Sequence, residues 1–331
     1  MIRIIIAAVF LSTSFLHSFA ADGLRIGIIG LDTSHVIAFT KLINDPNHPD
    51  HVSGGKVVAA YKGGSPDVDS SRTRVDRFTT QLQDEFGVKI VSSIESLCDQ
   101  VDAIMLESVD GRPHLEQARP VIAKGIPLFI DKPVAGSLED ALEIFRLAKD
   151  KDVPIFSSSS YRFYPSLTEL AESKIGEIRA AISYGPCHLE AHHPDLYWYG
   201  VHPTEALFTI LGTGCKQVSR VATKDTDIVT GLWTKGRTGV LYGLRTKSTP
   251  HKVIAFGANG VTEQGSGGGY APLVEQIMTF FKTGTSPVSR SETIEIFAFM
   301  EAADESKRRG GAPVKIDELI RANGGSWFLD N

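Results

Sequence analysis

The chain has 331 residues, 42% of them hydrophobic and 22% charged, which is enough for two domains with their own cores. A net charge of −5 without any basic run argues against a nucleic acid or an anionic membrane surface as partner. Three scattered cysteines, Cys98, Cys187 and Cys215, are too few for a disulfide framework, so they are predicted as small buried residues, with one disulfide at most.

Residues 1–21 have the pattern of a Sec-type signal peptide. Arg3 precedes an apolar run over residues 4–11, and small residues flank a cleavage point after Ala20. The run is too short for a membrane span, although an uncleaved anchor is the alternative. We therefore expect export to the periplasm or the medium.

Residues 22–150 show strands alternating with helices. Strands are predicted at 24–30, 56–61, 88–91, 101–106 and 127–130, with a sixth at 153–157. Helices are predicted at 36–43, 74–86, 93–99, 114–124 and 137–150, the last capped by Ser137. This alternation predicts a doubly wound parallel sheet of the Rossmann type, followed by a second domain over 151–331.

The turn after the first strand departs from the dinucleotide pattern G-x-G-x-x-G. Gly30 is the first glycine, but Asp32 and His35 stand at the second and third positions. Asp32 adds bulk and negative charge where a pyrophosphate would approach, or it caps the helix, as Thr33 or Ser34 also can. The helix start can still attract an anion, so dinucleotide binding stays open here.

The end of the second strand lacks the acid that would bind a ribose. Lys62 and Ser65 follow it, with Arg72 and Arg74 nearby. These residues favour NADP over NAD if either binds, because they suit a 2′-phosphate. The alternative is a loop that is merely solvated.

The strand at 127–130 runs into Asp131, Lys132 and Pro133. Pro133 ends the strand, which leaves Lys132 at the carboxyl edge of the sheet, where ligands bind in open α/β folds. The alternative is a surface-loop lysine.

Several motifs in order carry a family resemblance. They are Gly27-Ile-Ile-Gly30, the strand 101–106 leading to His114, Ile130-Asp-Lys-Pro-Val134, Gly200-Val-His202, and the helix around 302–306 followed by Pro313. Over about residues 24–316 the chain resembles the glucose–fructose oxidoreductase / inositol dehydrogenase / MocA (Gfo/Idh/MocA) family. The resemblance implies a Rossmann domain plus an α/β domain with a large, open, mostly antiparallel sheet, and a dimer or tetramer. It also implies NAD(P)-dependent oxidation or reduction of a sugar or cyclitol carbinol.

The resemblance also implies roles for particular residues. Lys132 matches the family's catalytic lysine, which contacts both the substrate and the nicotinamide ribose, and His202 matches its general acid/base. Glu205 matches a second acidic position and is expected to orient His202. Trp198 stands where the family usually has an aspartate.

The second domain begins with a predicted helix at 161–173 and strand at 176–184. A run of antiparallel strands is predicted at 216–223, 228–234, 239–244, 252–256 and 261–263, with helices at 203–211, 273–282 and 292–308.

A polar cluster lies between residues 188 and 202. If the strand continues to His192, then His188, Glu190 and His192 share one face and can bind a transition metal. The second interpretation is a polar sugar pocket, and the third is structural hydrogen bonding. The pocket interpretation involves His193, Asp195, Tyr197, Trp198 and Tyr199.

Two functions follow from these patterns. The first is an NAD(P)-dependent sugar or cyclitol oxidoreductase. The second is an exported, non-redox carbohydrate-active protein, either a metal-assisted lyase or hydrolase or a sugar-binding protein. The missing glycines, the missing ribose acid and export away from free dinucleotide support the second. The oxidoreductase remains the first hypothesis, because Lys132 and His202 both stand in register with the family's motifs.

Overall fold

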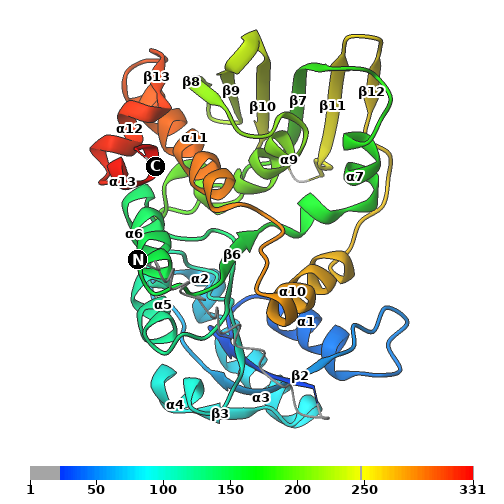
Figure 1. Cartoon of the computed structure of the whole chain (residues 1–331), viewed down its shortest axis with the longest axis vertical. Helices are drawn as coiled ribbons and strands as arrows, with labels where there is room; N and C mark the ends of the chain where they lie inside the picture. Colours follow the sequence, from blue (N-terminus) through cyan, green and yellow to red (C-terminus); the bar gives the residue numbers. More distant parts are fainter. Residues whose placement is uncertain (1–22, 247, 331) are drawn as a thin grey trace, which may run out of the picture.

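The computed structural model describes residues 23–246 and 248–330, so the predicted signal peptide lies outside the described residues. The first sheet has six parallel strands in the order β3-β2-β1-β4-β5-β6 (Figure 1). Its strands are β1 (Leu24–Ile29), β2 (Gly55–Tyr61), β3 (Lys89–Val91), β4 (Ala103–Leu106), β5 (Leu128–Asp131) and β6 (Ile155–Ser158). The predicted Rossmann-type sheet is confirmed.

Helices connect these strands. They are α1 (His35–Asn44), α2 (Asp69–Arg72), α3 (Val75–Phe86), α4 (Ile94–Cys98), α5 (His114–Ala123) and α6 (Leu138–Asp150). The predicted cap of α6 is confirmed, because the Ser137 hydroxyl accepts a hydrogen bond from the Asp140 N–H at 3.0 Å. Every residue of β4 and β5 is buried, as expected for strands covered by helices on both faces.

The second sheet has seven strands in the order β12-β11-β7-β10-β9-β8-β13. They are β7 (Ile178–Pro186), β8 (Cys215–Ala222), β9 (Thr226–Trp233), β10 (Thr238–Leu244), β11 (Lys252–Gly257), β12 (Val261–Glu263) and β13 (Val314–Lys315). Only β7 and β10 pair in parallel, so the prediction of a mostly antiparallel sheet is confirmed.

Helices α9 (Val201–Leu211) and α11 (Arg290–Arg308) cover one face of this sheet (Figure 1). The Trp233 ring packs between these helices, with its centre 5.3 Å from the centre of the Phe208 ring and 5.9 Å from that of the Phe299 ring. The remaining short elements are η1 (Ser160–Phe163), α7 (Pro165–Ala171), α8 (Asp195–Trp198), η2 (Thr234–Gly236), α12 (Ile316–Ala322) and α13 (Ser326–Leu329).

Residues beyond 150 complete the first domain. Strand β6 pairs with β5, and helix α10 (Ala271–Thr283) returns to pack beside α1 (Figure 1). The Phe280 ring of α10 lies 4.8 Å from Phe156 in β6. Strand β6 and helix α10 therefore pack with the first domain although both follow residue 150 in the sequence.

Two local predictions can be compared with the structure. All three cysteines are buried free thiols, as predicted for small core residues. The condition that the strand continues to His192 is not met, since β7 ends at Pro186, which has no N–H with which to extend the ladder, and residues 187–194 form a loop. Among the helices of the described residues, none combines the length and apolar character needed to cross a bilayer.

Candidate active site between the two domains

A cavity of about 340 Å³ lies at the carboxyl edge of the parallel sheet, against the start of α1. The first domain and the loop before α9 both contribute to its walls. Its lining includes Thr33, Ser34, His35, Arg74, Lys132, Trp198, Tyr199, His202, His251 and Tyr270. The size suits a monosaccharide or the reactive end of a larger ligand.

His202 enters this cavity from the first turn of α9. Its Nδ1 lies 2.7 Å from the Ser159 hydroxyl, at the end of β6. Burial, reinforced by the positive charge of Lys132, holds the pKa of His202 well below its usual range. The imidazole is therefore neutral at physiological pH and available to accept a proton.

Glu205 does not orient His202, so the expected role is wrong. Its Oε2 accepts hydrogen bonds from Arg162 Nε at 2.9 Å and from the Ser158 hydroxyl at 3.0 Å. Because Arg162 is itself buried, the carboxylate is needed to compensate the guanidinium. The residue that fixes the His202 ring is Ser159, which the sequence did not single out.

Lys132 reaches the same cavity from the end of β5. Its ammonium lies 5.9 Å from the centre of the Tyr199 ring, and the Tyr199 and His202 rings are 5.2 Å apart. Burial lowers the pKa of Lys132, while Asp131 opposes that shift. The structure thus brings together the predicted lysine and histidine.

The predicted substrate residues separate into two groups. Trp198 and Tyr199 line the cavity, but Tyr197 is buried and donates a hydrogen bond to Glu301 at 3.3 Å. Asp195 accepts hydrogen bonds from Arg220 at 2.9 Å and Lys307 at 2.5 Å. Both Tyr197 and Asp195 thus contact residues of helix α11, and neither lines the cavity.

His193 also makes a contact between elements. Its buried Nε2 lies 3.0 Å from Asp110 Oδ1, in the loop after β4. Although burial opposes it, hydrogen bonds from His193 and Arg112 lower the pKa of Asp110. His193 therefore joins the second domain to the first and does not face the cavity.

The alternative metal set lies in the 187–194 loop. His192 Nδ1 is 2.8 Å from Glu190 Oε1, whereas the His188 ring packs edge-on against Tyr199 at 5.4 Å. The three side chains do not share a strand face, which removes the geometric basis of that prediction.

The turn after β1 fits a phosphate despite its missing glycines. Gly30 has φ +85°, and a Cβ there would lie 2.5 Å from the Ser108 Cα, so only glycine is tolerated. Asp32 is buried and does not cap α1, because its carboxylate accepts hydrogen bonds from the Ser71 hydroxyl at 2.6 Å and the Val109 N–H at 2.8 Å. Asp32 is turned inward and Ser34 provides no side-chain cap, whereas Thr33 Oγ1 accepts a long hydrogen bond of 3.4 Å from the His35 N–H. The first turn of α1 is therefore only weakly capped by side chains and can bind an anion.

The predicted 2′-phosphate group is not assembled. Lys62 pairs with Asp76 at 2.6 Å, and Arg72 pairs with Asp69 at 2.6 Å. Ser65 is buried against Ser71, its N–H donating at 2.7 Å. Of the four residues only Arg74 lines the cavity, so the geometry gives no preference for NADP over NAD.

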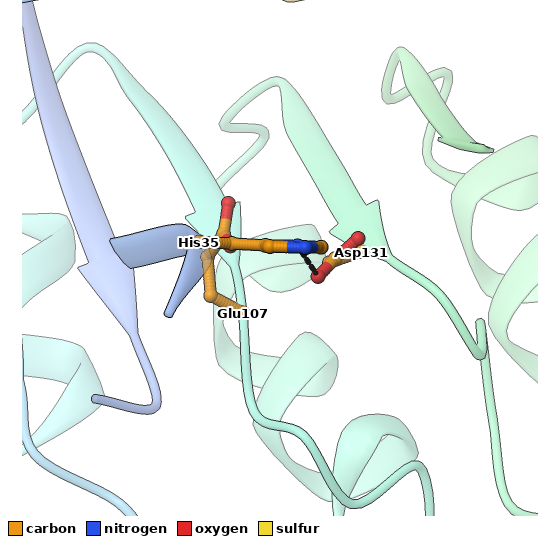
Figure 2. Close-up of side chains that lie close together, drawn as sticks. All are labelled: His35, Glu107 and Asp131. Carbon is orange, nitrogen blue, oxygen red and sulfur yellow. Dashed lines mark hydrogen bonds and ion pairs between the residues drawn. The ribbon is translucent and has the colours of Figure 1, made fainter. Parts of the chain in front are cut away.

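Three residues at the floor of the site were not predicted as a group. His35 Nδ1 lies 2.6 Å from Asp131 Oδ2, and Glu107 lies beside them at the end of β4 (Figure 2). The sequence did hold a signal, because Asp131 replaces the glutamate of the family's Glu-Lys-Pro motif and His35 replaces the third glycine.

A Rossmann sheet with a lysine and a histidine meeting at its carboxyl edge, joined to a mixed sheet, defines the class of two-domain dehydrogenase folds. Residues 24–159 match the model of the oxidoreductase family with an NAD-binding Rossmann fold. The match to this Gfo/Idh/MocA family spans all six strands of the first sheet.

Three known proteins are similar to this chain. D-xylose 1-dehydrogenase (NADP(+)) 2 of Haloferax volcanii is 24% identical over 169 residues, which is 49% of this chain and 51% of that protein. The chain thus matches about half the length of this relative. Apo scyllo-inositol dehydrogenase from Lactobacillus casei is 13% identical with a TM-score of 0.73, covering 90% of this chain and 100% of that one. Myo-inositol 2-dehydrogenase from Lactobacillus plantarum is 16% identical with a TM-score of 0.69, covering 89% and 99%.

Proposed function

We propose that the protein is an NAD(P)-dependent oxidoreductase that acts on a secondary hydroxyl of a sugar or cyclitol. The observation that carries this proposal is the meeting of Lys132 and His202 in one cavity beside the open start of α1. The names of the xylose and inositol dehydrogenases that it resembles support the substrate class.

The proton chemistry follows from the two side chains. Nδ1 of His202 is hydrogen-bonded to the Ser159 hydroxyl, and in the tautomer that carries its proton on Nδ1 the Nε2 atom accepts the proton of a substrate hydroxyl. The Lys132 ammonium would stabilise the negative charge that develops on the same oxygen. A bound nicotinamide would supply the hydride acceptor, or the donor in the reverse direction.

The chain's own residues would hold the cofactor at two points. The start of α1, where Ser34 provides no side-chain cap, would bind the pyrophosphate. Lys132, which matches the family's catalytic lysine, would contact the nicotinamide ribose. Gly30 keeps the turn close to the sheet.

The test is turnover of a panel of pentoses, hexoses and inositols with NAD⁺ and NADP⁺ by the wild type and His202→Asn. We expect His202→Asn to bind the dinucleotide normally but to lose at least about 100-fold in kcat/KM. His192→Asn is the matched control, because His192 is exposed and paired only with acidic side chains. Turnover by His202→Asn at the wild-type rate, or no dinucleotide binding by the wild type, would reject the proposal.

We also propose that the protein is exported and works as a homo-oligomer. The pattern of residues 1–21 supports export, and N-terminal sequencing of the secreted or periplasmic protein tests it. Cytoplasmic protein that retains its N-terminal residues would contradict it. The non-redox alternative gains no metal site from residues 188–192, since His188 packs against Tyr199 and does not join the Glu190–His192 pair.

A further inference from the structure

We infer that His35, Glu107 and Asp131 form a binding site for one divalent first-row transition ion, with Zn²⁺ as the test case. Each residue offers one ligand atom, and these atoms all lie within 4.8 Å of one another (Figure 2). Bonds of about 2.1 Å place the ligand atoms of one ion on the order of 3 Å apart, so only small side-chain shifts are needed.

Glu107 is the residue that points to a missing partner. It is fully buried, and neither carboxylate oxygen has a hydrogen-bond partner within the described part of the chain. Burial raises the pKa of Glu107, and the charge of Lys132 opposes this shift without a hydrogen bond to the carboxylate. Buried carboxylates are paired or coordinate metals, and an ion between Glu107 and Asp131 would meet that need.

The surroundings hold the other two ligands in place. The Asp131 oxygen that does not face His35, Oδ1, accepts a hydrogen bond from the Lys132 N–H at 2.8 Å. The His35 ring is stacked on Phe39 at 5.1 Å and meets Tyr270 edge-on at 4.8 Å. Metal ligands are commonly oriented by such outer contacts, and the apolar walls limit water.

One imidazole and two carboxylates suit zinc, manganese or iron better than calcium or magnesium. Two carboxylates also balance the charge of a divalent ion. His35 lines the cavity that contains Lys132 and His202, which gives the ion an entry path and leaves its open positions facing a ligand oxygen. The test of this site measures metal binding alone, so its outcome does not depend on whether the protein is a dehydrogenase.

The experiment is a titration of the chelator-treated full chain with Zn²⁺ against a chromophoric competitor. We expect one ion per chain with a micromolar or tighter Kd. Glu107→Gln and His35→Gln should each weaken binding at least about tenfold, since each removes a ligand and leaves two. The control is Glu190→Gln, which alters the exposed Glu190–His192 pair and should bind like the wild type.

Circular dichroism shows whether the two ligand variants fold. A readout on the wild type needs no variant: bound Co²⁺ should show weak visible bands without the intense near-ultraviolet absorption of a thiolate ligand. The inference is overturned if the wild type binds no ion below about 0.1 mM, or if thiolate absorption appears. An equal loss of Zn²⁺ affinity in Glu190→Gln and Glu107→Gln would also overturn the inference.

Discussion

At the scale of single residues, burial decides which side chains can do chemistry. His202 and Lys132 are both shifted toward their neutral forms by burial, in a cavity that also contains Arg74. Glu205 was expected to act beside them, but it is held by Arg162. The catalytic assignment therefore rests on which buried groups keep a free polar atom facing the cavity.

The depressed pKa of His202 has a consequence for the pH profile of the proposed oxidation. A base must be neutral to act, and a group whose folded pKa is lowered stays neutral until the pH falls below that value. We expect kcat/KM for carbinol oxidation at saturating cofactor to stay level as the pH is lowered through 6.5. The initial-rate profile between pH 5 and 9 measures this. A half-loss of activity near pH 6.5 would show that His202 titrates normally or is not the base.

At the scale of elements, the sequence predicts regular strands and helices better than it predicts the loops between them. The strand at 127–130 and the helix at 137–150 are correct within a residue or two, because apolar runs and a serine cap are local signals. For the 187–194 loop, alternation of polar residues left a strand to His192 open, because alternation alone cannot show that pairing stops at Pro186.

The residues of the site can likewise be predicted only where a local motif contains them. Lys132 and His202 are predicted from motifs, whereas Ser159 and Glu107 come to the site only through the pairing of β5 with β6 and of β1 with β4. Contacts of that kind depend on the register of distant strands, which no local pattern carries.

Helix α11 contains a pH-dependent contact. Glu295 Oε1 accepts hydrogen bonds from the N–H groups of Gly214 and Cys215, at 2.7 and 2.5 Å, and so fixes the start of β8. Burial raises the pKa of Glu295 to about 7. The folded protein therefore holds a proton that the unfolded chain has released, and stability falls as the pH rises from about 4.5 to about 7.

Between pH 5 and pH 8 Glu295 should lower the free energy of unfolding of the wild type by on the order of 1 kcal/mol, and Glu295→Gln should abolish this decrease. The decrease is smaller than the full pKa shift would give, because the side chain is only partly buried. Glutamine still accepts both N–H groups but carries no charge. Urea unfolding at the two pH values measures the effect. Glu169→Gln, an exposed glutamate on α7, is the control. A pH slope that Glu295→Gln leaves unchanged would exclude this glutamate as its source.

At the scale of the whole molecule, the second sheet is covered on one face and open on the other. Helices α9 and α11 pack on its inner face. Across its outer face, Val221 of β8 pairs with Ile228 of β9, which pairs with Tyr242 of β10. Val221 is 63% exposed and Ile228 is 36% exposed. A contiguous apolar row of this kind is typical of a surface that another protein covers.

We expect a second copy of the chain to cover this face. Apolar burial at Ile228 would stabilise the association, and a lysine there would leave a charge in the contact, so Ile228→Lys should shift the protein to a monomer. Light scattering after size-exclusion chromatography at about 10 µM measures the mass. Thr80→Lys adds the same charge to an exposed position of α3 in the first domain and should leave the mass unchanged. A wild type that is already monomeric, or an Ile228→Lys protein that keeps the wild-type mass, would mean that this face does not join two copies.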